Sequence, residues 1–276
     1  MVLQCGRFSL PLETPLIMGV VNVTPDSFSD GGRCLDPAAA AGRAQELLDQ
    51  GAAIVDIGAE STRPGAQPVG EQEELDRILP VLERLEGLAA PVSVDTRRPG
   101  VMRAVLAAGA SMINDVNALC ADGALDALAA SEAAVCLMHK QGEPAHMQDA
   151  PRYVDVVQEV RGFLAARIAA ARAAGIGATR IAIDPGFGFG KNLQHNLALL
   201  RGLARFCDLG VAVLAGVSRK SMLERITGRP VGERLAASLA AALLAVQGGA
   251  RILRVHDVAE TRDALAVWSA FQECGQ

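Results

Sequence analysis

Short apolar runs alternate with longer amphipathic stretches along most of the chain. The short runs are rich in Val, Ile and Leu on both faces, a pattern typical of strands in a parallel sheet that is covered on both sides. They predict eight strands, at residues 17–23, 53–58, 92–95, 112–115, 135–139, 180–184, 211–217 and 252–256. The amphipathic stretches predict intervening helices, the clearest at residues 36–50, 71–86, 122–131, 154–174 and 233–247.

A short hairpin is expected before the first β/α unit, at residues 3–12, with Gly6 and Arg7 in its turn. Eight β/α units in a chain of 276 residues predict an α/β fold with one closed (β/α)₈ TIM barrel, and hence one domain spanning residues 1–276. A doubly wound sheet is the alternative, but it requires a glycine-rich fingerprint after the first strand, where Asn22 leads into Val-Thr-Pro-Asp instead. The apolar run at residues 264–271, which contains Trp268, could be a subunit interface or only the last barrel helix, and the helix is the preferred prediction.

Composition narrows the class of protein further. No apolar run approaches the roughly 20 residues of a membrane span, and no signal peptide is recognisable at the N-terminus. Six scattered cysteines without a C-x-x-C pair are typical of a reduced, cytoplasmic protein. A net charge of −5, dispersed basic residues and few aromatics argue against a nucleic-acid partner.

Polar residues close nearly all the predicted strands. In a barrel the active site lies where the carboxyl ends of the strands meet, so these residues are expected to face one cavity. Each of them alone could instead be a helix cap or an ordinary loop residue. They are Asn22, Asp95, Asn114, Asp115, His139, Asp184, the segment 218–221, Arg254 and His256.

Two chemical groups stand out among these residues. Asp95, Asn114 and Asp184 would match the donors and acceptors on the edge of a flat heterocycle. The cationic side chains suit an oxyanion such as phosphate, with Lys220 nearer the heterocycle; the others are Arg63, Arg254 and His256. Together they predict a phosphorylated heterocycle as ligand, although surface ion pairs remain the alternative for Arg63 and Arg254.

Four segments between the predicted strands and helices carry further candidate chemistry. Residues 184–192 place an acid before three alternate glycines, which would let the backbone adopt φ > 0 and give slack for flat ligands; a turn whose acid caps the next helix is the alternative. Residues 24–32 and 60–68 could close over the barrel mouth or be plain connections. At residues 218–221 a helix start could hold an anion, with a simple Ser221 cap as the competing and compatible reading.

Eight segments in order carry a resemblance to a known family: residues 18–32, 60–65, 93–96, 113–115, 137–139, 184–191, 218–222 and 254–257. With these the chain resembles the dihydropteroate synthases of bacterial folate biosynthesis over essentially its whole length. The resemblance implies a transferase that condenses (7,8-dihydropterin-6-yl)methyl diphosphate with 4-aminobenzoate, giving 7,8-dihydropteroate and diphosphate, with Mg²⁺ as cofactor. It also implies a homodimer that sulfonamides inhibit.

By the same resemblance, the pterin would be held by Asp95, Asn114, Asp184 and Lys220, with Met138 on its face. The diphosphate would be bound by Asn22, Thr62, Arg63, Arg254 and His256, with Asn22 also facing Mg²⁺. Phe28, Pro64, Phe189 and Ser221 would surround the aminobenzoate. The catalytic set would then be Asp95, Asp184, Lys220, Arg254 and His256.

Two other functions fit part of this pattern. A pterin-binding methyltransferase would share the pterin-binding set Asp95, Asn114 and Asp184. It would not need the loop at residues 22–32 or the pair Arg254 and His256. A pterin-binding module that has lost turnover is the other alternative, and the intact set of cationic residues argues against it. Asn117 and Lys140 depart from the residues that are frequent in the family, which puts rim contacts and affinity in question but not the type of reaction.

Overall fold

The computed structural model describes residues 1–23, 36–60, 69–142, 147 and 150–274. Eight parallel strands close into a barrel in the order β10-β3-β4-β5-β6-β7-β8-β9. These strands are β3 (Leu16–Asn22), β4 (Ile54–Gly58), β5 (Val92–Asp95), β6 (Met112–Asp115), β7 (Ala134–Met138), β8 (Ile181–Asp184), β9 (Ala212–Ala215) and β10 (Ile252–Val255). The fold is therefore the predicted (β/α)₈ barrel, and each predicted strand lies within two residues of an observed one.

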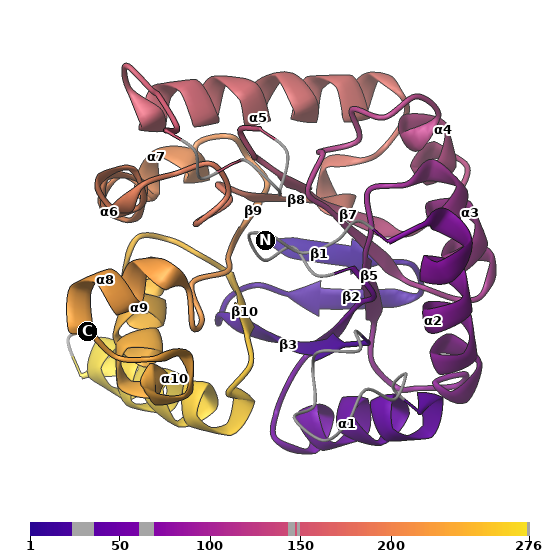
Figure 1. Cartoon of the computed structure of the whole chain (residues 1–276), viewed down its shortest axis with the longest axis horizontal. Helices are drawn as coiled ribbons and strands as arrows, with labels where there is room; N and C mark the ends of the chain where they lie inside the picture. Colours follow the sequence, from indigo (N-terminus) through magenta and orange to yellow (C-terminus); the bar gives the residue numbers. More distant parts are fainter. Residues whose placement is uncertain (24–35, 61–68, 143–146, 148–149, 275–276) are drawn as a thin grey trace.

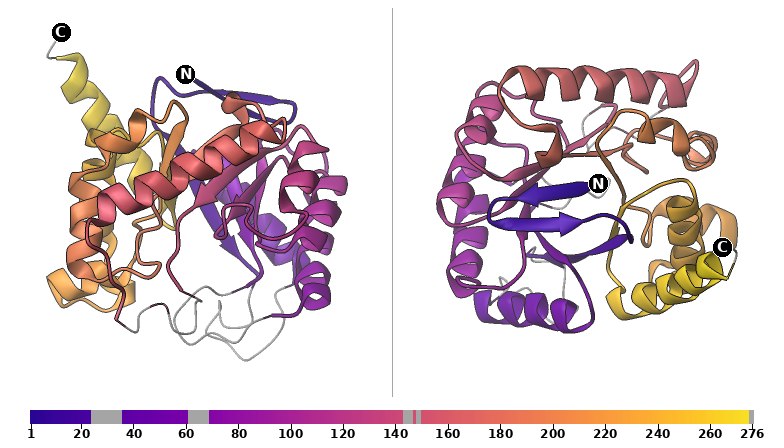
Figure 2. Two further views of the ribbon diagram at one scale, coloured as in Figure 1. Left: turned by 90° about the horizontal axis from the view of Figure 1, so that it is seen from above. Right: turned by 180° about the vertical axis from the view of Figure 1, so that it is seen from behind.

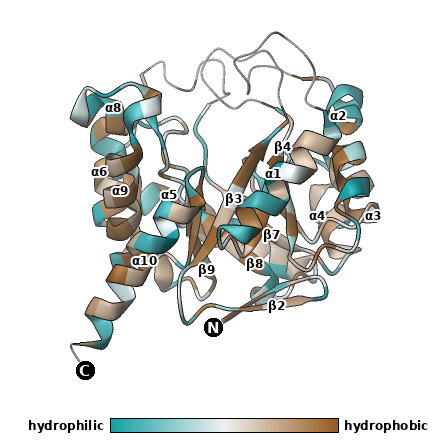
Figure 3. Cartoon of the chain, turned by 90° about the horizontal axis from the view of Figure 1, so that it is seen from below, coloured by the Kyte–Doolittle hydropathy of each residue, from teal (hydrophilic) through white to brown (hydrophobic). Residues whose placement is uncertain are grey.

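Helices surround the barrel on the outside (Figure 1). They are α1 (Pro37–Asp49), α2 (Glu71–Arg84), α3 (Pro99–Ala107), α4 (Ala124–Ala129), α5 (Val156–Ala173), α6 (Leu193–Arg201), α7 (Ala204–Cys207), α8 (Ser221–Thr227), α9 (Leu235–Gln247) and α10 (Val258–Glu273), with short 3₁₀ turns η2 (Ala178–Arg180) and η3 (Val231–Glu233). The strands are coloured mostly as hydrophobic, while the helices carry both hydrophobic and hydrophilic residues (Figure 3). Among the described helices, none is both long and apolar enough to cross a membrane.

The predicted hairpin forms from β1 (Val2–Cys5) and β2 (Phe8–Pro11), which are antiparallel. Its turn contains Gly6, with φ of +56°. The hairpin lies across one end of the barrel (Figure 2). Leu3 and Cys5 pack there against side chains from the strands, including Ile54 and Met112. Because the hairpin closes the amino-terminal end, ligands have access from the opposite end, where the strands carry their polar residues.

The last helix, α10, contains the whole apolar run 264–271, which confirms its expectation as a barrel helix. Helix α5 begins at Val156, where Asp155 caps it by accepting hydrogen bonds from the N–H groups of Val157 and Gln158. Such a cap satisfies donors that the first helical turn leaves free. Local signals of this kind explain why the long helices were predicted close to their observed bounds.

Candidate active site

The polar residues at the strand ends are brought to one rim by the strand register. Asp95 is paired with Asn114, and Met138 with Asp184. Asn22 lies two strands from Asp95 at the same level of the barrel, because both pair with one residue of β4. Neighbouring parallel strands place such residues about 5 Å apart in the direction of the hydrogen bonds. The sequence therefore located the rim correctly.

A guanidinium group joins two carboxylates in the barrel interior. Arg254 Nε lies 2.6 Å from Asp56 Oδ2, and its Nη2 lies 3.0 Å from Asp95 Oδ2. The sequence grouped Arg254 with the cations suited to an oxyanion; the structure also brings it into contact with the acidic floor, which we define as Asp56, Asp95 and Asp184. Burial raises the pKa of Asp95, and Arg254 opposes that shift. The cationic and acidic parts of the site are thus electrostatically joined.

Asp56 was missed by sequence reasoning. It is completely buried and also accepts a hydrogen bond from Asn114 Nδ2, at 3.2 Å. This contact fixes the amide orientation of Asn114, whose buried Oδ1 has no partner among the described residues. The available signal was an acid in the middle of the apolar strand β4, where an ionised side chain is costly unless it is paired.

Asp184 is buried, with 4% of its surface exposed. Its Oδ1 accepts a hydrogen bond from the N–H of Gly186 at 2.7 Å. Burial raises the pKa of this carboxyl, while the Gly186 N–H and the charge of Lys220 oppose the shift. Asp184 does not cap the following helix, because the side chain of Asn192 caps α6 in a capping box with His195. Its second oxygen, Oδ2, lies next to Gly216 in the barrel interior.

The glycines after Asp184 serve close backbone packing. Gly186 and Gly190 have φ of +72° and +63°, as the sequence allowed. A Cβ atom on Gly186 would lie 1.9 Å from the carbonyl oxygen of His139, and one on Gly190 would lie 2.1 Å from that of Gln141. Since no side chain fits at such distances, the glycines press this loop onto the end of β7. The expected slack for ligands is therefore not what Gly186 and Gly190 provide, whereas a Cβ atom on Gly188 would meet only the Lys220 side chain, at 3.4 Å.

Phe189 and Lys220 form one wall of the site. Lys220 Nζ lies 4.3 Å from the centre of the Phe189 ring, within the range of a cation–π contact. Burial lowers the pKa of Lys220 to about 8. Phe189 also belongs to a small apolar cluster with Val116, Met138 and Met147. The two residues expected to contact different rings, Met138 and Phe189, thus lie together.

Lys191 is a second residue that sequence reasoning did not assign. It is 2% exposed, and its ammonium lies 2.9 Å from the carbonyl oxygens of both Gly186 and Phe189. It also lies 3.0 Å from His139 Nδ1 and 3.3 Å from His139 O. Burial lowers the pKa of Lys191 to about 7, and burial with the charge of Lys191 lowers that of His139 to about 3. Lys191 therefore cross-links the glycine loop to β7.

The segment after β9 is tied to the end of β10. Ser218 Oγ lies 3.0 Å from His256 Nδ1, and Arg219 forms a two-point ion pair with Asp257. Ser221 is exposed and is the first residue of α8, whereas Lys220 occupies the cap position without a side-chain capping bond. The interpretation of Ser221 as a simple helix cap was therefore wrong.

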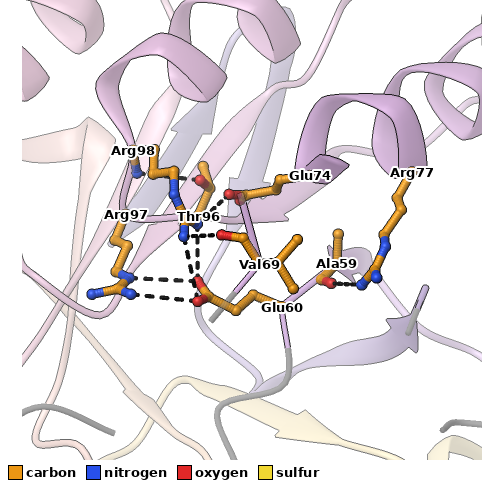
Figure 4. Close-up of polar contacts among 8 residues, drawn as sticks. All are labelled: Ala59, Glu60, Val69, Glu74, Arg77, Thr96, Arg97 and Arg98. Atoms are coloured by element: carbon orange, nitrogen blue, oxygen red, sulfur yellow. Dashed lines mark hydrogen bonds and ion pairs between the residues drawn. The ribbon is translucent and has the colours of Figure 1, made fainter. Parts of the chain in front are cut away.

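Phe28, Thr62, Arg63 and Pro64 lie outside the described residues. The residues that flank 61–68 are well connected, since Arg98 contacts both Glu60, at 3.0 Å, and the carbonyl oxygen of Val69 (Figure 4). Arg97 also contacts Glu60 (Figure 4). Arg98 follows Asp95 by three residues in the chain. The turn after β5 therefore contacts the residues on both sides of the segment 61–68, Glu60 and Val69.

The donor set fits Mg²⁺ only in part. Mg²⁺ takes oxygen ligands and is usually shared between one or two protein groups and the phosphates of a substrate. Asn22 offers an amide oxygen at the rim, while the described residues contain no cluster of three His, Cys, Asp or Glu side chains for a metal. An ion at this position would therefore depend on oxygens from a bound phosphorylated substrate.

Comparison with known proteins agrees with this geometry. The model of a family described as pterin binding enzymes matches residues 18–256. A dihydropteroate synthase from Neisseria meningitidis serogroup C is 51% identical over 274 residues, covering 98% of this chain and 97% of the relative. The chain belongs to the dihydropteroate synthase family.

Solved structures of the family superpose closely. A Xanthomonas albilineans dihydropteroate synthase with 4-aminobenzoic acid has a TM-score of 0.92 at 55% identity, covering 98% of each chain. A Burkholderia cenocepacia dihydropteroate synthase complexed with 7,8-dihydropteroate has a TM-score of 0.89 at 49% identity, covering 99% of this chain and 97% of the other. The comparisons support neither the methyltransferase nor the non-catalytic alternative.

Proposed function

We propose that the chain transfers a (7,8-dihydropterin-6-yl)methyl group from its diphosphate to the amine of 4-aminobenzoate. The C–O bond to the diphosphate breaks, a C–N bond forms, and the amine loses one proton. The observation that carries this proposal is the position of Arg254 on Asp95 and Asp56. A cation suited to the leaving group lies beside carboxylates suited to the positive charge that is left on the methylene carbon.

The pterin is held in the barrel interior. Asp184 accepts N–H groups from its guanidine-like edge, Asn114 presents its unpaired Oδ1, and Asp95 stabilises the developing cation. The burial of Asp184 and Asn114 supports this assignment, since unmatched groups there would be costly. Met138, next to Gly186, covers one face of the ring.

The 4-aminobenzoate lies on the ring of Phe189, with Lys220 between it and the pterin. The contact between Lys220 and Phe189 supports a shared wall for the two substrates. Phe28 and Pro64 complete the pocket, and Ser221 binds the carboxylate. Lys220 supplies a nearby positive charge that favours the carboxylate form of this substrate.

The diphosphate is bound by Arg254 and His256 together with Asn22, Thr62 and Arg63. Asn22 would hold Mg²⁺ together with the substrate's diphosphate, and the ion would supply neutralising charge for the leaving group. Arg254 has the donors for this role, because Nε and Nη2 contact Asp56 and Asp95 while Nη1 has no partner among the described residues. An arginine carries five N–H donors, so binding the floor does not exhaust it.

Turnover is tested by incubating the purified chain with the pterin diphosphate, 4-aminobenzoate and Mg²⁺ while following pyrophosphate. Release must depend on 4-aminobenzoate and be matched by dihydropteroate formation; no release above the single-substrate control contradicts the proposal. Asp184→Asn should weaken pterin binding by about 2 kcal/mol, roughly 30-fold, because a hydrogen bond to a charged group is lost. Asp263→Asn, on an exposed face of α10, is the matched control and should bind normally.

We also propose a homodimer in the cytoplasm. Leu244 on α9 and Val267 and Phe271 on α10 are more than half exposed, and α9 and α10 pack together, which supports a second copy as their cover. The described cysteines are free thiols, as in a reducing compartment. Sedimentation equilibrium should give a mass near 57 kDa, about twice the 28.7 kDa of the chain; a monomer at micromolar concentration contradicts the dimer.

A further inference from the structure

Ser218 and His256 make two contacts with each other. Ser218 Oγ lies 3.0 Å from His256 Nδ1, and the same oxygen accepts a hydrogen bond from the backbone N–H of His256 at 3.3 Å. Among the described residues, Ser218 Oγ has no other side-chain or backbone partner. The hydroxyl therefore lies between two nitrogen atoms of one residue.

The direction of the shorter bond follows from counting hydrogens. A serine hydroxyl has one hydrogen and two lone pairs. One lone pair already receives the backbone N–H of His256, and the only other contact of the oxygen is Nδ1. If Nδ1 carried the proton, the hydroxyl hydrogen would be left without an acceptor in a site where Ser218 is 6% exposed. The favoured arrangement is Ser218 O–H donating to Nδ1, which puts the ring proton on Nε2.

The backbone next to this hydroxyl is fixed on several sides. The neighbouring Arg219 has φ of +56°, a left-handed conformation that a non-glycine residue adopts only when its surroundings impose it. Its N–H donates to Ser238 Oγ at 3.0 Å, its carbonyl accepts from Arg234 at 3.0 Å, and its side chain is paired with Asp257. Residues of α9 and the end of β10 thus hold Ser218 in place.

The tautomer matters because His256 is neutral at physiological pH. Burial lowers its pKa to about 4, assisted by the charges of Arg254, Arg219 and Lys220, while Asp257 acts in the opposite direction. A neutral imidazole has one donor nitrogen and one acceptor nitrogen. With Nδ1 engaged by Ser218, Nε2 is the ring nitrogen left for a ligand, and only its protonated form can donate to an oxyanion.

We propose that Ser218 is a positioning residue that holds the His256 imidazole in the Nε2–H tautomer, so that the neutral ring donates a hydrogen bond to the leaving diphosphate. This inference rests on the proposed function for the identity of the anion. Without Ser218 the ring would also sample the Nδ1–H form, which turns a lone pair toward the phosphate oxygens.

Steady-state kinetics tests the role with three variants. Ser218→Ala should lower kcat/KM for the pterin diphosphate and weaken inhibition by pyrophosphate by roughly three- to tenfold, the effect of one hydrogen bond. The KM for 4-aminobenzoate should stay within about twofold of wild type, since that substrate does not touch His256 in the proposal. Ser218→Thr keeps a hydroxyl and should recover most of the loss, and Ser269→Ala on α10 serves as the matched control.

A double-mutant cycle separates positioning from a general structural effect. If Ser218 acts through the ring, adding Ser218→Ala to the His256→Ala variant should lower its kcat/KM for the pterin diphosphate by less than about twofold. Equal losses in both backgrounds would overturn the inference, as would an equal rise in the KM values of both substrates.

Nitrogen-15 spectra of the histidine-labelled full chain give a readout that needs no substrate. His256, assigned by its loss in His256→Ala, should show a protonated Nε2 and an unprotonated Nδ1 at pH 7.5, and Ser218→Ala should shift both signals toward a tautomer mixture. A proton on Nδ1 in the wild type refutes the inference. Failure of pyrophosphate release with the expected spectrum would refute the proposed function alone.

Discussion

Replacing Asp56 tests whether the buried ion pair organises the site. In Asp56→Ala, Arg254 loses its contact at 2.6 Å and Asn114 loses the acceptor of its Nδ2. Removing one partner of a buried pair typically costs about 3 to 5 kcal/mol of folding free energy. We expect the lower end, about 3 kcal/mol, because Arg254 retains Asp95 and its side chain is 22% exposed.

Asp56→Asn separates charge from hydrogen bonding. The amide oxygen can still accept from Arg254 and Asn114, so the cost should fall to about 1 kcal/mol, near that of a weakened hydrogen bond. Pyrophosphate should bind this variant at least as tightly as wild type, since Arg254 keeps its position while a nearby negative charge is removed.

Urea unfolding without ligand measures the stabilities, and calorimetry with pyrophosphate measures the binding. Asp263→Ala is the control, because its pair with Arg262 is exposed and should contribute less than about 0.5 kcal/mol. If Asp56→Ala unfolds within about 0.5 kcal/mol of wild type, the pair does not hold Arg254 and the reasoning is refuted. Weaker pyrophosphate binding by Asp56→Asn would refute the part played by charge.

Three further predictions concern the glycine loop and the histidine. Lys191→Met should raise the KM for 4-aminobenzoate and cost about 2 to 4 kcal/mol in urea unfolding, because carbonyls of the loop lose their donor; normal values for both would contradict a cross-linking role. Gly186→Ala should unfold or lose pterin binding, since its Cβ would meet His139 O at 1.9 Å, whereas Gly162→Ala, with open space around it, should be neutral or stabilising. The pKa of His256 is about 4 in the folded chain, against an ordinary value of 6.5. Between these pH values the unfolded chain binds more protons than the folded chain. The free energy of unfolding therefore has its full value above pH 6.5 and falls as the pH drops below it. From pH 7 to 4.5, wild type should therefore lose about 2 kcal/mol more than His256→Gln, and equal losses would show that the ring titrates normally.

The barrel could be predicted because its signals are local. Each strand is a short apolar run, and long helices such as α5 carry their own caps and amphipathic pattern. Helix α8, with seven residues, has too few turns for a clear period and was predicted only as a helix start. The same reasoning found the polar strand ends, because topology alone places them at one rim.

Asp56 and Lys191 escaped prediction because their roles depend on residues far away in the sequence. Asp56 lies within a strand rather than at its end, and its partner Arg254 is 198 positions away. Lys191 was assigned only to a motif, although its ammonium is defined by contacts with His139 across 52 positions. The glycines were interpreted as slack for the same reason, since their packing partner is the backbone at the end of β7.

The contacts of Arg254 explain why the acidic floor and the leaving-group site would not act independently. The acidic floor consists of Asp56, Asp95 and Asp184. These three carboxyl groups lie near two cationic side chains, Arg254 and Lys220. In the proposed reaction, departure of the diphosphate would place growing negative charge on one side of Arg254 and growing positive charge on the pterin beside Asp95. Both charges would develop next to groups that their contacts with each other already hold in position, so little reorganisation would be required. A lysine could not replace this arginine in the proposed reaction, because a single ammonium lacks the planar fork that reaches two carboxylates and would still leave a nitrogen for the diphosphate.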